Sequence, residues 1–192
     1  MKKILGLAIA LVLFMGMAGI GTWAYFSDVE TSTGNTLAAG TLDLKTGDYD
    51  GVTKTLEATN MAPGDTVGPE TITLKNSGSV AGATLDLAFS YIESDGSPNP
   101  NNEGADATAA MIEVTTLNYG NPSVSILGSV ADINTNGYKD IYDLKNDDLS
   151  GQSGIDASST KDFEIAVQLR PKTGNSFQAD GITVTMTFTL NQ

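Results

Sequence analysis

GITVTMTFTL, residues 181–190, alternates apolar and threonine side chains from Ile182 onward. Because successive side chains of a strand point to opposite faces of a sheet, this period of two predicts a strand with one face on a core. Residues 161–170 and 84–92 repeat the pattern, with Phe163 in the first and Phe89 in the second on the apolar face. Shorter pieces with the same period lie at residues 42–44, 52–56, 72–74, 112–117 and 124–127.

Turn-forming residues separate these pieces, notably Pro63-Gly64-Asp65, Asn76-Ser77-Gly78 and residues 171–174. About eight short strands at this spacing, without a long helical period, predict an all-β fold. We expect a jelly-roll-type antiparallel β-sandwich over residues 41–192. Helix is expected only in two short segments, residues 106–111 with Asp106 as N-cap and residues 141–149.

Composition limits the classes of function. The 192 residues suit one domain with a core of its own, and the net charge is −13. Cysteine and histidine are absent, which removes disulfides, a Ser-His-Asp triad, a cysteine nucleophile and the commonest zinc ligands. The negative charge argues against nucleic acid as a partner.

Catalysis would have to rest on carboxylates, lysine, tyrosine or serine alone. Paired carboxylates need a dry cleft, whereas Asp43 and Asp86 lie in strand patterns on the faces opposite their apolar neighbours, where we expect them to point at water. We expect a protein that is not an enzyme.

The N-terminus has the anatomy of a secretory signal peptide. Lys2 and Lys3 precede an apolar run from residue 4 to residue 18, and small residues follow to residue 24. This predicts a signal peptide over residues 1–24, cut between Ala24 and Tyr25, and a secreted protein of the extracellular matrix or cell surface. A retained membrane anchor is the alternative, although acids rather than basic residues follow the run. A type IV pilin leader would need a small residue where Lys3 stands.

Residues 132–143, DINTNGYKDIYD, predict a calcium loop. Calcium takes six to eight oxygen ligands, and the sharp turn at the sixth loop position favours glycine, here Gly137. The predicted ligands are the side chains of Asp132, Asn134, Asn136, Asp140 and Asp143, with the carbonyl of Tyr138. The spacing resembles the loops of EF-hand, dockerin and thrombospondin type 3 repeats.

The departures from an EF-hand predict weak affinity. Asp143 stands where glutamate is usual, Lys139 takes an apolar position, and no second loop is present. We expect a structural Ca²⁺ site with a Kd of about 0.1–1 mM. The alternative is an Asn/Asp-rich turn that leads into a short helix.

Two segments carry a more specific resemblance. GTWAYFSD at residues 21–28 is followed by NTLAAGTLDL at residues 35–44, and then by Pro63-Gly64-Asp65 and Asn76-Ser77-Gly78-Ser79. This pattern resembles the TasA/camelysin family. The match is strong over residues 18–92 and weaker beyond them.

The resemblance implies a jelly-roll subunit of biofilm-matrix fibres, or of bundling pili in archaeal relatives. It implies assembly by donor-strand complementation, in which the N-terminal segment, residues 25–40, adds as a strand to the next subunit. Its partners would be further copies of the chain, a dedicated signal peptidase and an anchoring or nucleating surface protein.

The residues of this segment allow such an addition. Residues 25–36 lack proline, and the candidate donor residues are Tyr25, Phe26, Ser27, Val29 and Thr31. All of them except Phe26 would share one face of a strand. Composition alone leaves two alternatives open, a segment folded back on its own domain and a disordered tail. The runner-up functions are a monomeric cell-surface or spore-coat-associated protein of the same fold and a camelysin-like secreted metalloprotease.

Overall fold

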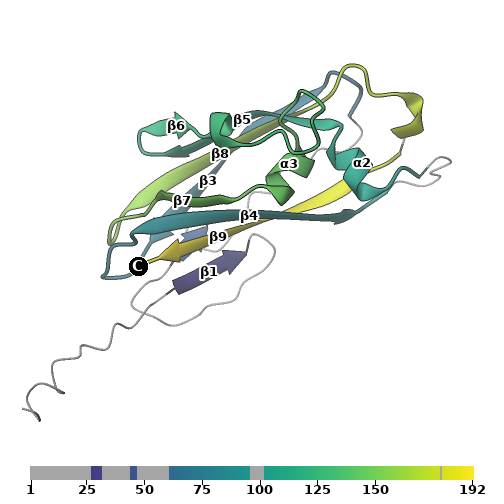
Figure 1. Ribbon diagram of the computed structural model, residues 1–192. Helices are drawn as coiled ribbons and strands as arrows, with labels where there is room; N and C mark the ends of the chain where they lie inside the picture. The colour runs from purple at the N-terminus through teal and green to yellow at the C-terminus, as the bar shows by residue number, and fades with distance from the viewer. Residues whose placement is uncertain (1–26, 32–43, 47–60, 96–101, 178) are drawn as a thin grey trace, which may run out of the picture.

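The structure, a computed structural model, describes residues 27–31, 44–46, 61–95, 102–177 and 179–192. Two antiparallel sheets face each other (Figure 1). The first has the order β1-β9-β4-β7, with bounds Ser27–Thr31, Ile182–Asn191, Thr84–Glu93 and Leu149–Ser153. The second has the order β2-β3-β8-β5-β6, with bounds Leu44–Thr46, Thr66–Asn76, Thr160–Leu169, Ile112–Gly120 and Ser123–Ser125.

The order of the strands is that of a jelly roll. The connections β3 to β4, β4 to β5, β6 to β7, β7 to β8 and β8 to β9 each pass from one sheet to the other. Among the described strands from β3 to β9, β5 and β6 are the one pair of consecutive strands that are neighbours in the same sheet. An antiparallel sandwich whose strands alternate between two sheets in this order is a jelly roll. The predicted all-β, jelly-roll-type sandwich is confirmed.

The core forms where the apolar faces of the two sheets meet. Phe163 of β8 is fully buried, with ring centroids 6.4 Å from Phe89 of β4 and 5.2 Å from Phe188 of β9. The three rings therefore join the two sheets at the centre of the sandwich. On the other face of β9, four threonines alternate with these apolar residues and are partly or fully exposed. The period of two in residues 181–190 thus corresponds to an inner and an outer face.

Asn76 explains the Asn-Ser-Gly motif that ends β3. Its fully buried side chain donates to the carbonyls of Val80 and Ile155 at 2.7 and 3.0 Å and accepts from the N–H of Gly78 at 3.0 Å. One amide therefore bonds three backbone groups at the point where the chain leaves one sheet for the other. A buried side chain that satisfies three backbone groups fixes this crossing.

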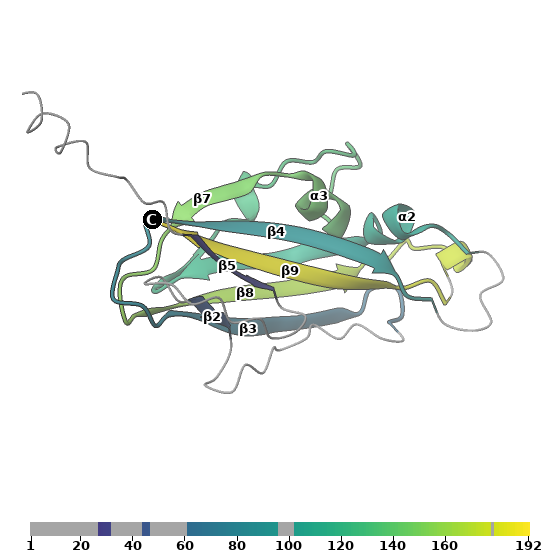
Figure 2. The ribbon, with the colours of Figure 1, turned by 90° about the horizontal axis from the view of Figure 1, so that it is seen from below.

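Strand β1, purple in Figures 1 and 2, lies at one edge of the first sheet beside β9, and β7 forms the opposite edge. It also contacts β2, which extends the second sheet beyond β3. Successive strands β1 and β2 therefore belong to different sheets, so no hairpin joins β1 to the strand that follows it.

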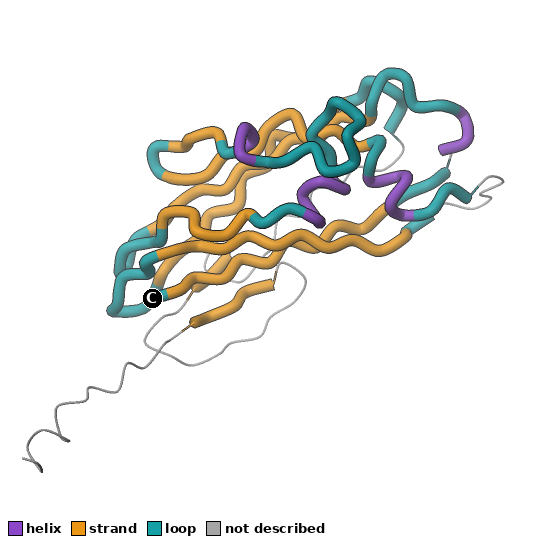
Figure 3. Tube along the Cα trace, in the orientation of Figure 1, coloured by secondary structure: helices purple, strands orange, loops and turns teal. Residues whose placement is uncertain are grey.

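Both predicted short helices are present, but three details of local structure differ from the sequence predictions. Helix α3 spans Ile141–Asn146 rather than residues 141–149, because Leu149 begins the edge strand β7, which has no alternating pattern. Helix α2 spans Ala105–Ala109 and has Gly104, not Asp106, as its N-cap. The piece at 124–127 is split between β6 and a 3-10 helix, Leu127–Ser129 (Figure 3). A second 3-10 helix spans Asn175–Phe177.

Several other predictions lie outside the described residues. These are the signal peptide, the cut at Ala24, the strand at 52–56 and most of the segment 25–40. None of the helices in the described part of the chain is long and apolar enough to cross a membrane.

Phe163→Ala should lower the free energy of unfolding by about 3–5 kcal/mol, because it removes the central ring of the core and leaves a cavity. Chemical denaturation measures this loss. Phe177→Ala is the matched control, because Phe177 is partly exposed in a 3-10 helix. An equal loss at the two positions would contradict the central place of Phe163.

Candidate functional site

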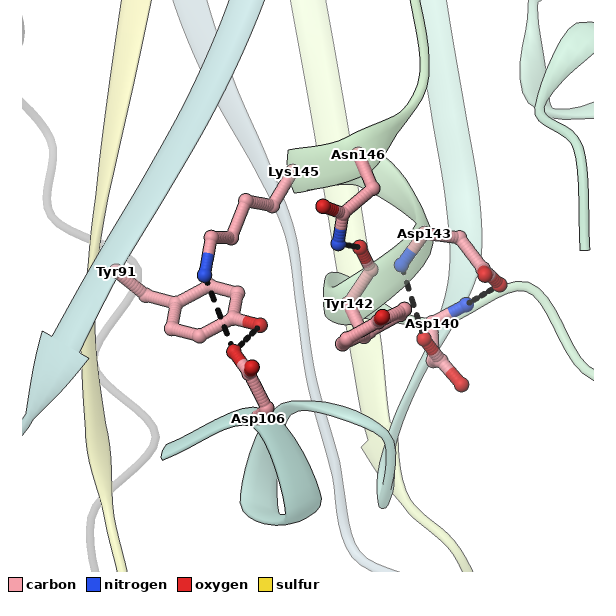
Figure 4. A network of polar contacts seen from close by, with 7 residues as sticks. All are labelled: Tyr91, Asp106, Asp140, Tyr142, Asp143, Lys145 and Asn146. Carbon is pink, nitrogen blue, oxygen red and sulfur yellow. Dashed lines mark hydrogen bonds and ion pairs between the residues drawn. The ribbon is translucent and has the colours of Figure 1, made fainter. Parts of the chain in front are cut away.

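The predicted calcium loop leads directly into α3. Asp140 is the N-cap of this helix and Asp143 its third residue, and both are fully buried. The N–H of Asp143 donates to Asp140 Oδ1 and the N–H of Asp140 donates to Asp143 Oδ2, each at 3.1 Å (Figure 4). This reciprocal pair is a capping box, which satisfies N–H groups that the first turn of a helix leaves free. Two of the predicted ligands therefore also start the helix.

The predicted ligands form one connected hydrogen-bond network. The side-chain amides of Asn134 and Asn136 both donate to Asp140 Oδ2, at 3.1 and 2.7 Å. Asp143 Oδ1 accepts from the N–H of Ile133 at 2.9 Å, so the far end of the loop is tied to its start. The loop thus brings Asn134, Asn136, Asp140 and Asp143 together, as the spacing predicts.

Asp132 holds the turn of the loop. Its two carboxylate oxygens accept from the N–H groups of Asn136 and Gly137, at 3.1 and 2.9 Å. Gly137 has φ +85°, the left-handed conformation that glycine adopts at low cost. The glycine at the sixth loop position therefore has the role that the sequence assigns to it.

Tyr138 and Arg170 tie the loop to the end of β8. The guanidinium of Arg170 lies 3.9 Å from the centroid of the Tyr138 ring, and its Nη1 donates to the carbonyl of Ala110 at 3.0 Å. A guanidinium at this distance from the ring is attracted by the ring electrons. Arg170 thereby links Tyr138 of the loop to Ala110 at the end of α2.

Burial raises the pKa of Asp140 above its ordinary value, and the nearby charge of Asp143 raises it further. Hydrogen bonds from Asn134, Asn136 and the backbone N–H of Asp143 act in the opposite direction, but burial outweighs them. Two adjacent buried carboxylates are costly when both are ionised, and a bound cation is one way to lower that cost.

The described residues do not include a ready-made carboxylate cage. Within residues 61–95, 102–177 and 179–192, no group of three or more acidic side chains lies close enough together to hold a metal ion. The predicted site would combine the carboxylates of Asp132, Asp140 and Asp143 with two amides and a carbonyl, and all three carboxylates accept hydrogen bonds from backbone N–H groups. Calcium binding therefore stays a prediction.

A second polar cluster joins α3 to the first sheet (Figure 4). Asp106 Oδ1 accepts from Tyr91 Oη at 2.7 Å and from Lys145 Nζ at 3.0 Å, and Nζ lies 4.2 Å from the centroid of the Tyr91 ring. The hydrogen bond from Tyr91, followed by that from Lys145, lowers the pKa of Asp106. Burial and the bond to Asp106 raise the pKa of Tyr91. Sequence reasoning does not find this cluster, because Tyr91 and Lys145 lie 15 and 39 residues from Asp106.

The second candidate site is β1. It pairs antiparallel with β9, from Ser27 opposite Asn191 to Thr31 opposite Thr187, with Val29 opposite Thr189. Three of the predicted donor residues, Ser27, Val29 and Thr31, belong to this strand. Ala24, Tyr25 and Phe26 lie outside the described residues. Residues 27–31 thus pair with their own domain, which is one of the alternatives that composition left open.

The whole chain, residues 1–192, matches the family model described as camelysin metallo-endopeptidase. The chain belongs to the camelysin family. This confirms the resemblance to the TasA/camelysin family and supports a secreted protein of that general type. A search of curated proteins finds no match.

The name of the camelysin family implies a catalytic metal ion, usually zinc in metallo-endopeptidases. Zinc sites in proteins are built mainly from histidine and cysteine, and this chain contains neither. The described residues also hold no group of three acids that could replace them. The residues of this camelysin-family chain therefore do not fit a catalytic zinc ion.

The expectation that Asp86 points at water is corrected by two hydrogen bonds that its carboxylate accepts. Asp86 lies on the outer face of β4, but its carboxylate accepts from the N–H of Gly151 at 2.8 Å and from Asn191 Nδ2 at 2.7 Å. It thereby links the edge strand β7 to the end of β9, a structural role. Asp43, the other acid considered for chemistry, lies outside the described residues.

Asp106→Asn should lower the stability of the protein at neutral pH but not in acid. The folded-state pKa of Asp106 is lowered, so its ionised form stabilises the fold above the unfolded-state pKa of about 4. That contribution is lost as the pH falls through the folded-state value. Denaturant unfolding at several pH values should show a difference from wild type that shrinks below about pH 4. Asp156→Asn, at an exposed site, is the control, and a difference independent of pH would contradict the assignment.

Proposed function

We propose that this chain is an extracellular structural protein, a subunit of biofilm-matrix fibres or bundling pili that assemble by donor-strand complementation. The observation that carries the proposal is the position of β1. It completes the edge of the first sheet beside β9, yet no hairpin joins it to the next strand. A strand held at an edge by main-chain pairing can be supplied by another copy of the chain.

Removal of a leader at Ala24 would favour this exchange. Cleavage there leaves only Tyr25 and Phe26 ahead of β1, so the strand would begin close to a free end of the chain. A free end can reach the β9 edge of a neighbour without threading a loop. Each subunit would then donate one strand and accept one, a head-to-tail contact that does not close and makes a filament.

Exchange would also resolve an exposed edge. A chain whose β1 is donated presents the unpaired N–H and C=O groups of β9, which are a template for pairing. The strand of the preceding subunit covers them, so every subunit except the last is complete. The anchoring or nucleating surface protein implied by the family would cover the edge of the first or last subunit.

The proposed cofactor is a structural Ca²⁺ ion in the loop 132–143. Asn134, Asn136, Asp140 and Asp143 converge in a connected network, and the buried pair Asp140 and Asp143 carries like charges at the start of α3. Calcium would neutralise this pair and hold the loop against the sandwich. Its ligands would be those predicted from the sequence, including the carbonyl of Tyr138 and a rotated Asp132.

A second candidate function is a monomeric surface protein of the same fold. The observation that favours it is again β1, because pairing with its own β9 gives a complete sandwich in a single chain. A metalloprotease is the third candidate function. The absence of histidine and cysteine, the usual zinc ligands, argues against it.

Calcium at about 10 mM should raise the free energy of unfolding by about 1.4–2.7 kcal/mol for a Kd of about 0.1–1 mM. Thermal or chemical unfolding with calcium and with a chelator measures the difference. Asp132→Ala should abolish this calcium-dependent gain without touching the capping box, whereas Asp156→Ala, outside the loop, should keep it. Equal stability of the wild type with and without calcium would contradict a calcium site.

Assembly is tested by electron microscopy of two purified chains, residues 25–192 and residues 40–192, at the same concentration. Fibres are expected from the first chain only, because the second lacks the strand to be donated. Fibres from both would separate polymerisation from β1 and contradict donor-strand exchange. Monomers from both would favour the monomeric surface protein.

A further inference from the structure

The register of β1 against its own β9 is unusual for a strand that covers a core. Asp28 lies opposite Leu190 and Glu30 lies opposite Phe188. Directly opposite residues of an antiparallel pair belong to the same face of the sheet. Leu190 and Phe188 are fully buried core residues. The closed register therefore assigns two acidic positions to the core side of the sheet.

The remaining positions of β1 belong to the outer face. Val29 lies opposite Thr189 and Thr31 opposite Thr187, and both threonines are only partly buried. The single apolar residue of β1 is thus assigned to the polar side. Because side chains alternate with a period of two, a shift by one residue would exchange the two sets. Val29 would then share the face of Phe188 and Leu190, and the acidic positions would lie on the threonine face.

We propose that β1 uses two registers: the closed one against its own β9, and one shifted by a single residue when it is donated to the β9 of a second copy. This inference rests on the proposed function. In the closed register the acids on the core side give a weak pairing that still covers the edge of β9. Inward-placed charge on an edge strand is one of the ways in which proteins prevent unwanted strand addition. The closed chain is then a latent monomer.

The shifted register explains why exchange would proceed although both states pair the same two strands. Burial of Val29 in place of two acidic positions favours the donated strand over the returned one. The free energy that drives polymerisation would come from this change of face rather than from a new contact area. The number of main-chain bonds at the β9 edge need not change.

The absence of cysteine from the chain makes the register directly measurable. Three donor variants, Asp28→Cys, Val29→Cys and Glu30→Cys, are each mixed with the acceptor variant Thr189→Cys, assembled and oxidised. Opposite positions of a strand pair have the spacing that a disulfide needs. In fibres, a mixture of Thr189→Cys with Asp28→Cys or with Glu30→Cys should give more covalent dimers than the mixture with Val29→Cys. In dilute monomer the double variant V29C/T189C should form its disulfide within one chain, and D28C/T189C should not.

The outcomes separate this inference from the function on which it rests. Dimers mainly from Val29→Cys in fibres would overturn the shifted register and leave donor-strand assembly standing. Fibres absent from every mixture and from the wild type would overturn both. A sample of Thr189→Cys alone gives the amount of covalent dimer that forms by random collision. This amount is subtracted from that of each mixture.

Two further substitutions test the same point without cysteines. Val29→Asp should stop fibre formation yet leave the unfolding midpoint of the monomer unchanged, because position 29 pairs with Thr189 on the outer face in the closed register. Glu30→Val should raise that midpoint and slow assembly. A lowered midpoint for Val29→Asp together with normal fibres would contradict the two registers.

Discussion

The main-chain pairing of β1 with β9 is the interaction on which the state of this protein depends. It closes one edge of the first sheet, and it is made by a strand that no hairpin joins to its successor. Most of the jelly roll is fixed by its core, in which Phe163 joins both sheets. The edge beside β9 is different, because in the proposed assembly a second copy of residues 27–31 would fill it. The same pairing would then serve a complete monomer and a growing filament, and the register of β1 would differ between the two.

The loop 132–143 shows a different way of using acidic residues. Asp140 and Asp143 are buried at the start of α3, where each satisfies a backbone N–H of the other. Through Lys145, the same helix contacts Asp106 and Tyr91, which belong to α2 and β4. The loop, two helices and the first sheet therefore form one polar framework at the end of the sandwich (Figure 4). The proposed calcium ion in the loop would stiffen that framework.

The sequence predicts the long strands and the turn at Gly137 well, because both depend on local spacing. The alternation in residues 181–190 identifies β9, and glycine at position 137 identifies the turn. Strand β7 is missed because its residues Leu149–Ser153 have no alternating pattern and are held at an edge by pairing with β4. The partners of Asp86 and Asp106 are missed because they come from distant elements. The register of β1 against β9 also cannot be predicted from a single sequence. In the structure this register assigns Asp28 and Glu30 to the core side of the sheet.

The most direct test is a cryo-electron microscopy map of the fibre in which the strand beside β9 can be traced along the chain. If the strand is exchanged, it will continue into β2 of the neighbouring subunit, with Val29 on the side of Phe188 and Leu190. A strand that continues into β2 of the same subunit would show that fibres form through another surface, and it would contradict exchange of β1 as the basis of assembly.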